Sequence, residues 1–160
     1  MIPAAIRLRG MRADALPLLS NSLAGSYEVL SGGEEEAGVD YRPDISLESE
    51  GEYRDRLLYD RARDRIIGST RRGPHRDDFT FLLNSRDARS YASEGQQRGL
   101  VLALRLSEFS YICDTRKRVP VLLADDVLGE LDSVRKANFD KLLPSTAQVF
   151  ASGTSMPPSD

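Results

Sequence analysis

Several residue types that would assign a protein to a class are scarce in this chain of 160 residues. Cys113 is its single cysteine, so no internal disulfide can form, and this composition suits a reducing cytoplasm. No apolar run approaches the roughly 20 residues that a membrane-spanning helix needs. The N-terminal residues also lack the apolar core of a signal peptide. The sequence therefore predicts a cytoplasmic protein with no membrane partner.

Two further absences concern nucleotides and nucleic acids. The sequence has no Gly-x-x-x-x-Gly-Lys-Ser/Thr segment, so it does not encode the usual loop that cradles ATP phosphates. The net charge of −3 provides no general attraction to nucleic acid. Lysine is rare, because 3 of the 22 basic residues are lysine and the others are arginine. Arginine suits bidentate phosphate contacts, although genome composition would produce the same bias.

The first part of the chain predicts two helices separated by extended segments. Apolar residues recur at steps of three and four over 4–24, which indicates an amphipathic helix that ends at Gly25. Tyr27–Leu30 and Val39–Tyr41 are then expected to form a hairpin around a loose acidic loop. A second helix is expected to follow and to end at Ile67.

The elements predicted after Gly68 alternate between helix and strand, which is the pattern of an α/β sheet. A helix at 94–112 is apolar on most sides up to Leu106, so we expect it to be deeply buried. Val119–Ala124 is a continuous apolar run, typical of a strand covered on both faces. The other predicted elements are a hairpin of Phe79–Leu83 with Arg86–Ser90 turning at Asn84–Ser85, a helix at 133–143 and a strand at Gln148–Ala151.

The segment Tyr91–Arg98 opens the 94–112 helix and fits a capping box, with Ser93 as the N-cap and Gln96 reaching back to it. Gly95 lies within the first turn, where glycine destabilises a helix unless another group must approach closely. A helix N-terminus presents free backbone N–H groups and the positive end of the helix dipole. The segment is therefore a candidate site for an anion such as phosphate.

The apolar strand at Val119–Ala124 leads directly into two carboxylates, Asp125 and Asp126. Open α/β sheets bind ligands at the carboxyl ends of their strands, and two like charges are an unusual choice for a purely structural turn. Asp125 is therefore a candidate ligand of Mg²⁺, which usually keeps part of its water shell. Asp126 is a candidate general base that would polarise an attacking water.

The segment Gly73–Asp78 contains the only histidine of the chain, His75. A zinc site built on it would lack ligands, because no second histidine is available. We therefore predict a rigid loop whose charged groups bond to neighbouring residues. The weakest of three interpretations of the chain makes it a metal-dependent phosphoesterase that uses His75, Asp77, Asp78, Asp125 and Asp126.

Three segments in this order, Gly73–Asp78, Tyr91–Arg98 and Leu122–Asp132, resemble the C-terminal part of the RecF family of bacterial DNA replication and repair proteins. The resemblance implies an α/β fold, the C-terminal lobe of a P-loop (ABC-type) ATPase head, with the remnant of a helical arm before it. It also implies that the chain is a portion of a longer protein. The implied domains are a partial arm with a small hairpin at 1–67, the lobe at 68–155 and a disordered tail at 156–160.

The resemblance also assigns roles to individual residues. It implies that Ser93 and Gly95, with Gln96 beside them, contact the γ-phosphate of an ATP molecule held by the opposite subunit. It implies that Asp125 coordinates Mg²⁺ and that Asp126 is the catalytic carboxylate.

Two further residues receive roles, and two depart from the family's pattern. Asp132 would be the aspartate of the D-loop at the dimer interface, and Thr154 would lie in the switch region. Gly129 replaces the more usual serine of the D-loop, and Glu94 puts a negative charge into the signature motif, where it disfavours phosphate.

For the complete family protein, the resemblance implies Mg²⁺-dependent ATP hydrolysis coupled to ATP-dependent homodimerisation. It implies binding to single-stranded or gapped DNA, and recombinational repair together with RecO and RecR as part of the response to DNA damage. Without a P-loop, this chain is not expected to hydrolyse ATP alone. The alternative interpretation is a non-catalytic, ATP-sensing partner module that supplies Ser93 and Gly95 in trans.

Overall fold

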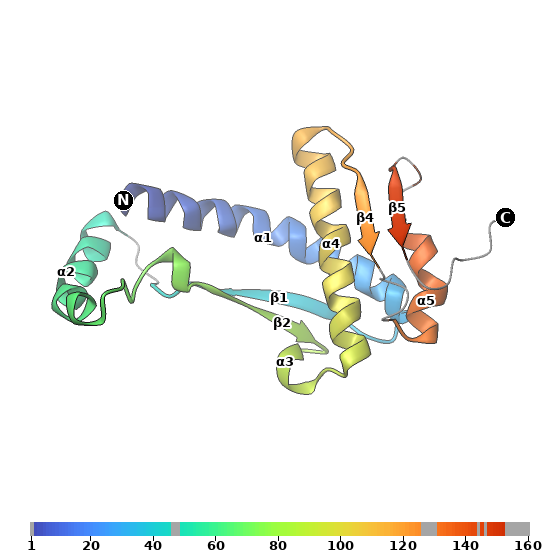
Figure 1. Ribbon diagram of the computed structural model, residues 1–160, viewed down its shortest axis with the longest axis horizontal. Coiled ribbons are helices and arrows are strands. Elements are labelled where there is room, and N and C mark those ends of the chain that lie inside the picture. The colour runs from blue at the N-terminus through green and yellow to red at the C-terminus, as the bar shows by residue number, and fades with distance from the viewer. Residues whose placement is uncertain (1, 46–48, 126–130, 144, 146, 153–160) are drawn as a thin grey trace. The chain divides into compact units, whose positions relative to one another are not determined.

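The computed structural model describes residues 2–45, 49–125, 131–143, 145 and 147–152 (Figure 1). None of the described helices combines the length and the hydropathy that crossing a membrane requires. Helices and strands are mixed along the chain, which confirms the predicted α/β class. The elements in chain order are α1 (Ile2–Ser31), β1 (Ala37–Arg42), α2 (Glu50–Ile67), η1 (Pro74–Arg76), β2 (Asp78–Leu83), β3 (Arg86–Asp87), α3 (Ala88–Tyr91), α4 (Glu94–Arg116), β4 (Leu122–Asp125), α5 (Ser133–Phe139), η3 (Asp140–Leu142) and β5 (Val149–Ser152).

Contacts divide the chain into two compact units that interleave along the sequence. Unit 1 comprises Met1–Pro17 and Asp40–Thr80, and unit 2 comprises Leu18–Val39 and Phe81–Asp160. The division after residue 67 that the family resemblance implies stays a prediction. The tail at 156–160 lies outside the described residues.

Helix α1 is longer than the sequence predicted. The expected strand Tyr27–Leu30 is wrong, because this segment forms the last turns of α1. Leu23 and Tyr27, four residues apart on one helix face, are completely buried, so packing continues the helix past Gly25. The chain leaves the helix at Gly32, whose φ of 74° lies in the left-handed region that favours glycine.

A three-stranded sheet has the order β1-β2-β3, in which β2 and β3 are antiparallel. Asn84 and Ser85 connect these two strands with φ values of 49° and 63°, which confirms the predicted hairpin turn. The second strand of the hairpin is shorter than expected. It ends at Asp87, because that side chain accepts a hydrogen bond from the Arg89 N–H (2.9 Å) and caps α3.

Strands β4 and β5 form a parallel pair with α5 between them in the sequence, as predicted for an α/β unit (Figure 1). The register places Asp125 opposite Ser152, so both lie at the carboxyl edge of the pair. The prediction that this strand is covered on both faces is wrong for the described residues. Ala124 is buried, but Leu123 on the other face is 75% exposed.

The hydrophobic core of unit 2 lies between the second half of α1, the start of β1, the end of β2, α3 and α4. The predicted helix at 94–112 is confirmed as α4, which extends to Arg116. It buries one face rather than most sides, since Val101 is 59% exposed. The buried members of this core are Leu23, Tyr27, Leu30, Ala37, Leu83, Ala88, Leu100 and Ala103.

Unit 1 contains α2, whose ends follow from local sequence. Ser49 caps the first turn in a capping box with Glu52, and Gly68 ends the helix in the left-handed conformation. The rings of Tyr41 and Phe79 stack with their centroids 5.1 Å apart. These local contacts position the loop that follows α2.

Gly99 lets side chains from two other helices of unit 2 lie against α4. A Cβ atom at this position would lie 2.8 Å from Nε of Arg135 in α5 and 3.3 Å from the Tyr27 ring in α1. The first distance is shorter than real Cβ contacts, and the second is tighter than most of them. The absence of a side chain at Gly99 therefore lets the Arg135 side chain pass directly over α4.

We expect Gly99→Ala to lower the free energy of unfolding by about 1–3 kcal/mol, because the new methyl group must displace Arg135 or Tyr27. Urea unfolding followed by circular dichroism measures the change. The matched control is Gly25→Ala in α1, where a Cβ has nothing within 4 Å. This control should be neutral or stabilising by up to about 1 kcal/mol, as alanine favours a helix interior. Equal effects of the two changes would contradict the packing described here.

Candidate functional site

The N-terminus of α4 is built as the sequence predicted. Ser93 Oγ accepts a hydrogen bond from the Gln96 N–H (3.3 Å), and Gln96 Oε1 accepts one from the Ser93 N–H (2.6 Å). This reciprocal pair confirms the capping box. The N–H groups of Glu94 and Gly95 have no intrahelical acceptor, as in the first turn of any helix. Ser93 is exposed and Gly95 is half-buried, so an anion can reach this end of the helix.

Glu94 lies in the same turn and carries the negative charge that departs from the family's pattern. Its carboxylate accepts a hydrogen bond from Nη2 of Arg98, one helical turn later, at 2.7 Å. The ion pair is exposed, and it offsets part of the charge of Glu94 next to the candidate anion site.

The carboxylate of Asp132 lies beside the first turn of α4. A Cβ atom on Gly95 would lie 3.2 Å from Oδ2 of Asp132, so glycine at this position permits the approach of that carboxylate. Asp132 caps α5 by accepting hydrogen bonds from the Arg135 N–H (2.9 Å) and from Nη1 of Arg135 (2.5 Å). The backbone hydrogen bond, followed by the guanidinium contact, lowers the pKa of the Asp132 carboxyl, which is therefore ionised at neutral pH.

Arg135 is the centre of a buried polar network. Its side chain is 9% exposed, and Nη2 donates to the hydroxyl of Tyr27 (2.9 Å) and to Oε2 of Glu35. The Tyr27 hydroxyl donates in turn to Oε2 of Glu35 (2.9 Å). Burial raises the pKa of Tyr27 to about 12, although the nearby Arg135 opposes this shift, so the hydroxyl keeps its proton. Oε1 of Glu35 accepts from Nε2 of Gln96 (2.5 Å).

Sequence reasoning missed Glu35, Tyr27 and Arg135. The acidic segment was expected to be a loose loop, and this expectation is wrong. The N–H of Glu36 donates to Oδ1 of Asn84 and its C=O accepts from the Asn84 N–H, both at 2.8 Å. No local pattern marks Glu35, because two of its three partners, Gln96 and Arg135, lie 61 and 100 residues away in the sequence.

Asp125 lies at the carboxyl edge of β4 with its side chain exposed. Ser152 Oγ donates a hydrogen bond to Oδ1 of Asp125, across the parallel register of β4 and β5. Carboxylate and hydroxyl oxygens are the ligands that Mg²⁺ prefers, so this edge fits the predicted ion. The other two candidates of this region, Asp126 and Thr154, lie outside the described residues.

In unit 1, the loop Gly73–Asp78 is organised around one buried carboxylate. Asp77 is 1% exposed at its side chain and accepts hydrogen bonds from Arg12 Nη1 (2.5 Å), the Tyr41 hydroxyl (2.5 Å) and the Asp44 N–H (3.0 Å). Burial, followed by the hydrogen bond to Asp77, raises the pKa of Tyr41. The predicted bonding of the loop's charged groups to neighbouring residues is confirmed. The carboxylate of Asp77 serves the structure of the loop.

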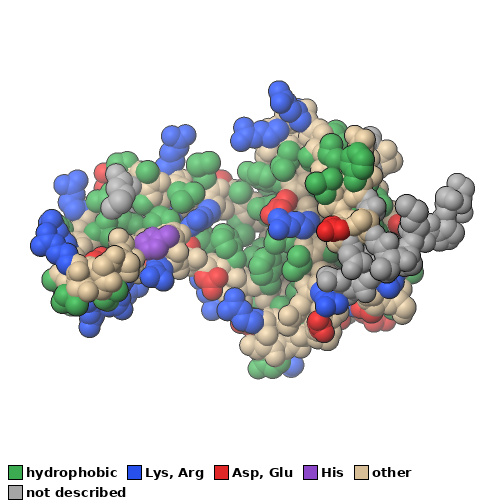
Figure 2. Space-filling model, viewed as in Figure 1, with side chains coloured by type: hydrophobic (Ala, Val, Ile, Leu, Met, Phe, Trp, Pro, Cys, Tyr) green, Lys and Arg blue, Asp and Glu red, His purple; other side chains and the backbone are tan. Residues whose placement is uncertain are grey.

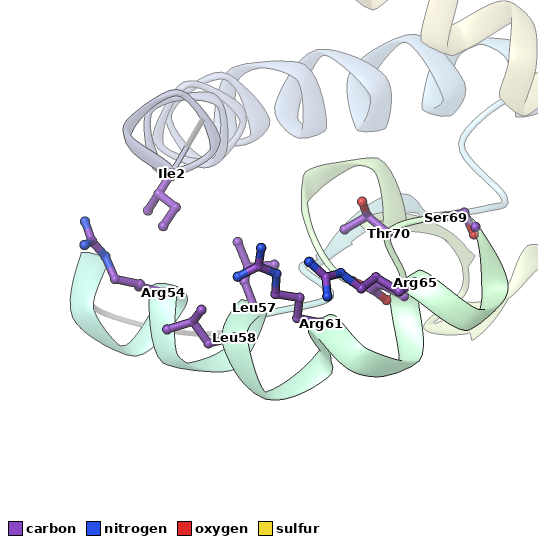
Figure 3. A pocket seen from close by; sticks show the side chains of 10 residues that line it. Ile2, Arg54, Leu57, Leu58, Arg61, Arg65, Ser69 and Thr70 are labelled. Atoms are coloured by element: carbon purple, nitrogen blue, oxygen red, sulfur yellow. The ribbon is translucent and has the colours of Figure 1, made fainter.

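A groove of about 580 Å³ lies elsewhere in unit 1, along α2 (Figure 3). Three arginines of that helix, Arg54, Arg61 and Arg65, line it, and Ser69 and Thr70 close one end. Within the described part of the chain, no carboxylate lies within ion-pairing distance of these arginines. The carboxylate of Asp64 also lines the groove, so three arginines and one carboxylate give its described lining a net positive charge.

No family model matches this chain. Individual proteins do match it. The DNA replication and repair protein RecF of Moorella thermoacetica is 43% identical to this chain over 143 residues. That alignment covers 89% of this chain and 38% of the relative. RecF of Citrifermentans bemidjiense is 38% identical over 163 residues, covering 98% of this chain and 45% of the relative. This chain belongs to the RecF family.

A solved structure supports the same assignment. The recombination mediator protein RecF, in complex with ATP and described as part of the RecFOR pathway, superposes with a TM-score of 0.79 at 29% identity. The match covers 99% of this chain and 44% of that RecF chain. The predicted α/β lobe is therefore confirmed as a RecF fold. The chain spans less than half the length of the RecF relatives that it matches.

We expect Asp77→Asn to destabilise this RecF chain by about 2–4 kcal/mol, because an amide would direct N–H groups at Arg12 or Tyr41 and leave a guanidinium without its counter-charge. Chemical unfolding measures the loss. Asp78→Asn is the control. Asp78 is exposed, and among the described residues it accepts only from the N–H of Phe79, so we expect a change within about 0.5 kcal/mol. A loss of similar size in both variants would rule out Asp77 as the centre of the loop.

Proposed function

We propose that this chain is the signature-bearing lobe of a RecF-type ATPase head, which meets ATP held by a second subunit and acts on DNA in recombinational repair. One observation carries the proposal: the accessible N-terminus of α4, with Ser93 as its cap, has Gly95 within its first turn and Asp132 beside it. Ser93 and Gly95 would meet the γ-phosphate, with Gln96 beside them. Free N–H groups and the helix dipole favour the phosphate there.

The remaining roles concern the metal ion and the interface. Asp125 would hold Mg²⁺, and its exposed carboxylate at the edge of β4 supports this assignment. Asp126 would act as the catalytic carboxylate and Thr154 as the switch-region residue. Asp132 would face the second subunit as the D-loop aspartate. Mg²⁺ would neutralise charge on the phosphates during their transfer.

The proposed partners follow from family membership. The relatives are named DNA replication and repair proteins, which supports a role on DNA. The solved RecF structure contains ATP and is described within the RecFOR pathway, which supports ATP as the ligand. We propose that the complete protein forms an ATP-dependent homodimer, works with RecO and RecR, binds single-stranded or gapped DNA and acts in the cytoplasm. Because this sequence has no P-loop, the chain alone would not turn over ATP.

The arginine groove of α2 is the proposed DNA contact of this chain. Figure 2 shows Lys and Arg side chains gathered over α2. Arg54, Arg61 and Arg65 are spaced by seven and four residues, so they lie along one side of that helix. Guanidinium groups of this kind bind phosphates along a nucleic acid strand.

For nucleotide binding, we expect fluorescent ATP to bind a mixture of this chain with a P-loop-bearing half of a RecF protein, and not the chain alone. Ser93→Ala should weaken binding by the mixture roughly 10- to 150-fold, because a charge-assisted contact in such a site contributes about 1.5–3 kcal/mol. Ser110→Ala is the control, since this serine lies in the same helix and donates to the Leu106 C=O. An affinity for fluorescent ATP that Ser93→Ala leaves unchanged would refute the proposed role of the signature motif.

For DNA binding, we expect Arg61→Ala to weaken binding of single-stranded DNA about fivefold and to reduce the salt dependence of log K by about 0.7, the value for one lost phosphate contact. Fluorescence anisotropy over a salt series measures both quantities. Arg105→Ala is the control, because Arg105 pairs with Glu108 at 2.8 Å in unit 2. The same loss in both variants would assign the effect to net charge and not to the groove.

A further inference from the structure

Glu35 contacts two of the proposed nucleotide-facing segments at once. One carboxylate oxygen, Oε1, accepts from Nε2 of Gln96 in α4 (2.5 Å), and the other, Oε2, accepts from Nη2 of Arg135 in α5. The Glu35 side chain is 17% exposed, so these contacts replace most of its hydration. A single carboxylate from the connection between α1 and β1 therefore joins the starts of two helices.

Each partner of Glu35 binds it with one end of its side-chain polar group, and this contact orients the other end of that group. Since Nε2 of Gln96 donates to Glu35, Oε1 of the same amide is turned to the Ser93 N–H and closes the capping box. Since Nη2 of Arg135 donates to Glu35, Nη1 of the same guanidinium is turned to Asp132. The planar geometries of the amide and the guanidinium leave no freedom to rotate one end alone.

We propose that Glu35 is a positioning residue that holds Ser93 and Asp132 in one arrangement, through Gln96 on one side and Arg135 on the other. The role rests on the proposed function, in which both residues face a nucleotide or a second subunit. Glu35 itself touches neither. It sets the distance between the start of α4 and the carboxylate of Asp132, and Tyr27 completes the contact by donating to the same Oε2.

The charge of Glu35 is essential to this role, and not only its shape. Arg135 is buried, and its guanidinium is compensated by the carboxylates of Asp132 and Glu35. Asp132 is 39% exposed at its side chain and is the weaker partner for a buried charge. With a neutral side chain at position 35, Asp132 would be the one carboxylate left to compensate the Arg135 guanidinium. The starts of α4 and α5 would then no longer be held in a fixed orientation.

The test compares Glu35→Gln with Glu34→Gln, which removes the same charge from the neighbouring, exposed residue. Hydrogen exchange is followed at four amides. Those of Gln96 and Gln97 bond to Ser93, and those of Arg135 and Lys136 bond to Asp132. We expect Glu35→Gln to accelerate exchange about tenfold at both helix starts, while amides in the middle of α4 stay protected and Glu34→Gln changes none of them.

A second measurement connects the arrangement with the nucleotide. In the mixture with the P-loop-bearing half, Glu35→Gln should raise the dissociation constant for fluorescent ATP about tenfold, and Glu34→Gln should leave it unchanged. If Glu35→Gln does not fold, Tyr27→Phe removes one hydroxyl from the same carboxylate and should show the same pattern at a smaller size.

The outcomes separate this proposal from the proposed function. Exchange that stays slow, or accelerates at only one helix start, overturns the joint positioning by Glu35 whatever the nucleotide does. Acceleration at both starts with unchanged nucleotide binding overturns its role in nucleotide capture. Absence of nucleotide binding by the unaltered mixture refutes the proposed function, and the exchange data then still decide whether Glu35 couples the two helices.

Discussion

The burial of one guanidinium group, that of Arg135, constrains the arrangement of unit 2 more than any other interaction described. A buried charge is tolerated only when hydrogen-bonded counter-charges surround it. Here the partners come from three places in the chain: Tyr27 in α1, Glu35 before β1 and Asp132 at the start of α5. Each segment must therefore reach the same point. The end of α1 and the acidic segment cannot move away from α5 without leaving this charge unpaired.

Two glycines of α4 make room for the same group of side chains. Gly95 and Gly99 are one turn apart, and Cβ atoms on them would meet Asp132 and Arg135 respectively. Glycine in a helix interior costs about 1 kcal/mol relative to alanine. That cost is offset where the partner can approach the helix backbone directly. From the sequence, Gly95 was interpreted as leaving space for the approach of a phosphate. In the structure, the same lack of a side chain also leaves space for the carboxylate of Asp132.

Local signals in the sequence were sufficient for the capping box at Ser93, the hairpin turn at Asn84 and the parallel unit of β4 and β5. Each depends on residues a few positions apart, where the backbone itself sets the geometry. Two failures, the strand expected at Tyr27–Leu30 and the loose acidic loop, come from contacts that are distant in the sequence. Tyr27 was placed in a strand because Gly25 looked like a helix stop, while its buried contacts with distant residues keep it helical.

The acidic residues show how a structural carboxylate differs from one available for chemistry. Asp77 and Glu35 are equally acidic in the sequence, yet each is surrounded by donors of its own chain and has little exposure. Asp125 accepts from one hydroxyl and faces solvent at the carboxyl edge of β4. A metal ion needs oxygen lone pairs that are not already occupied by protein donors. On this criterion Asp125 is suited to Mg²⁺, whereas Asp77 is committed to the fold, which weighs against a metal site in the loop that contains His75.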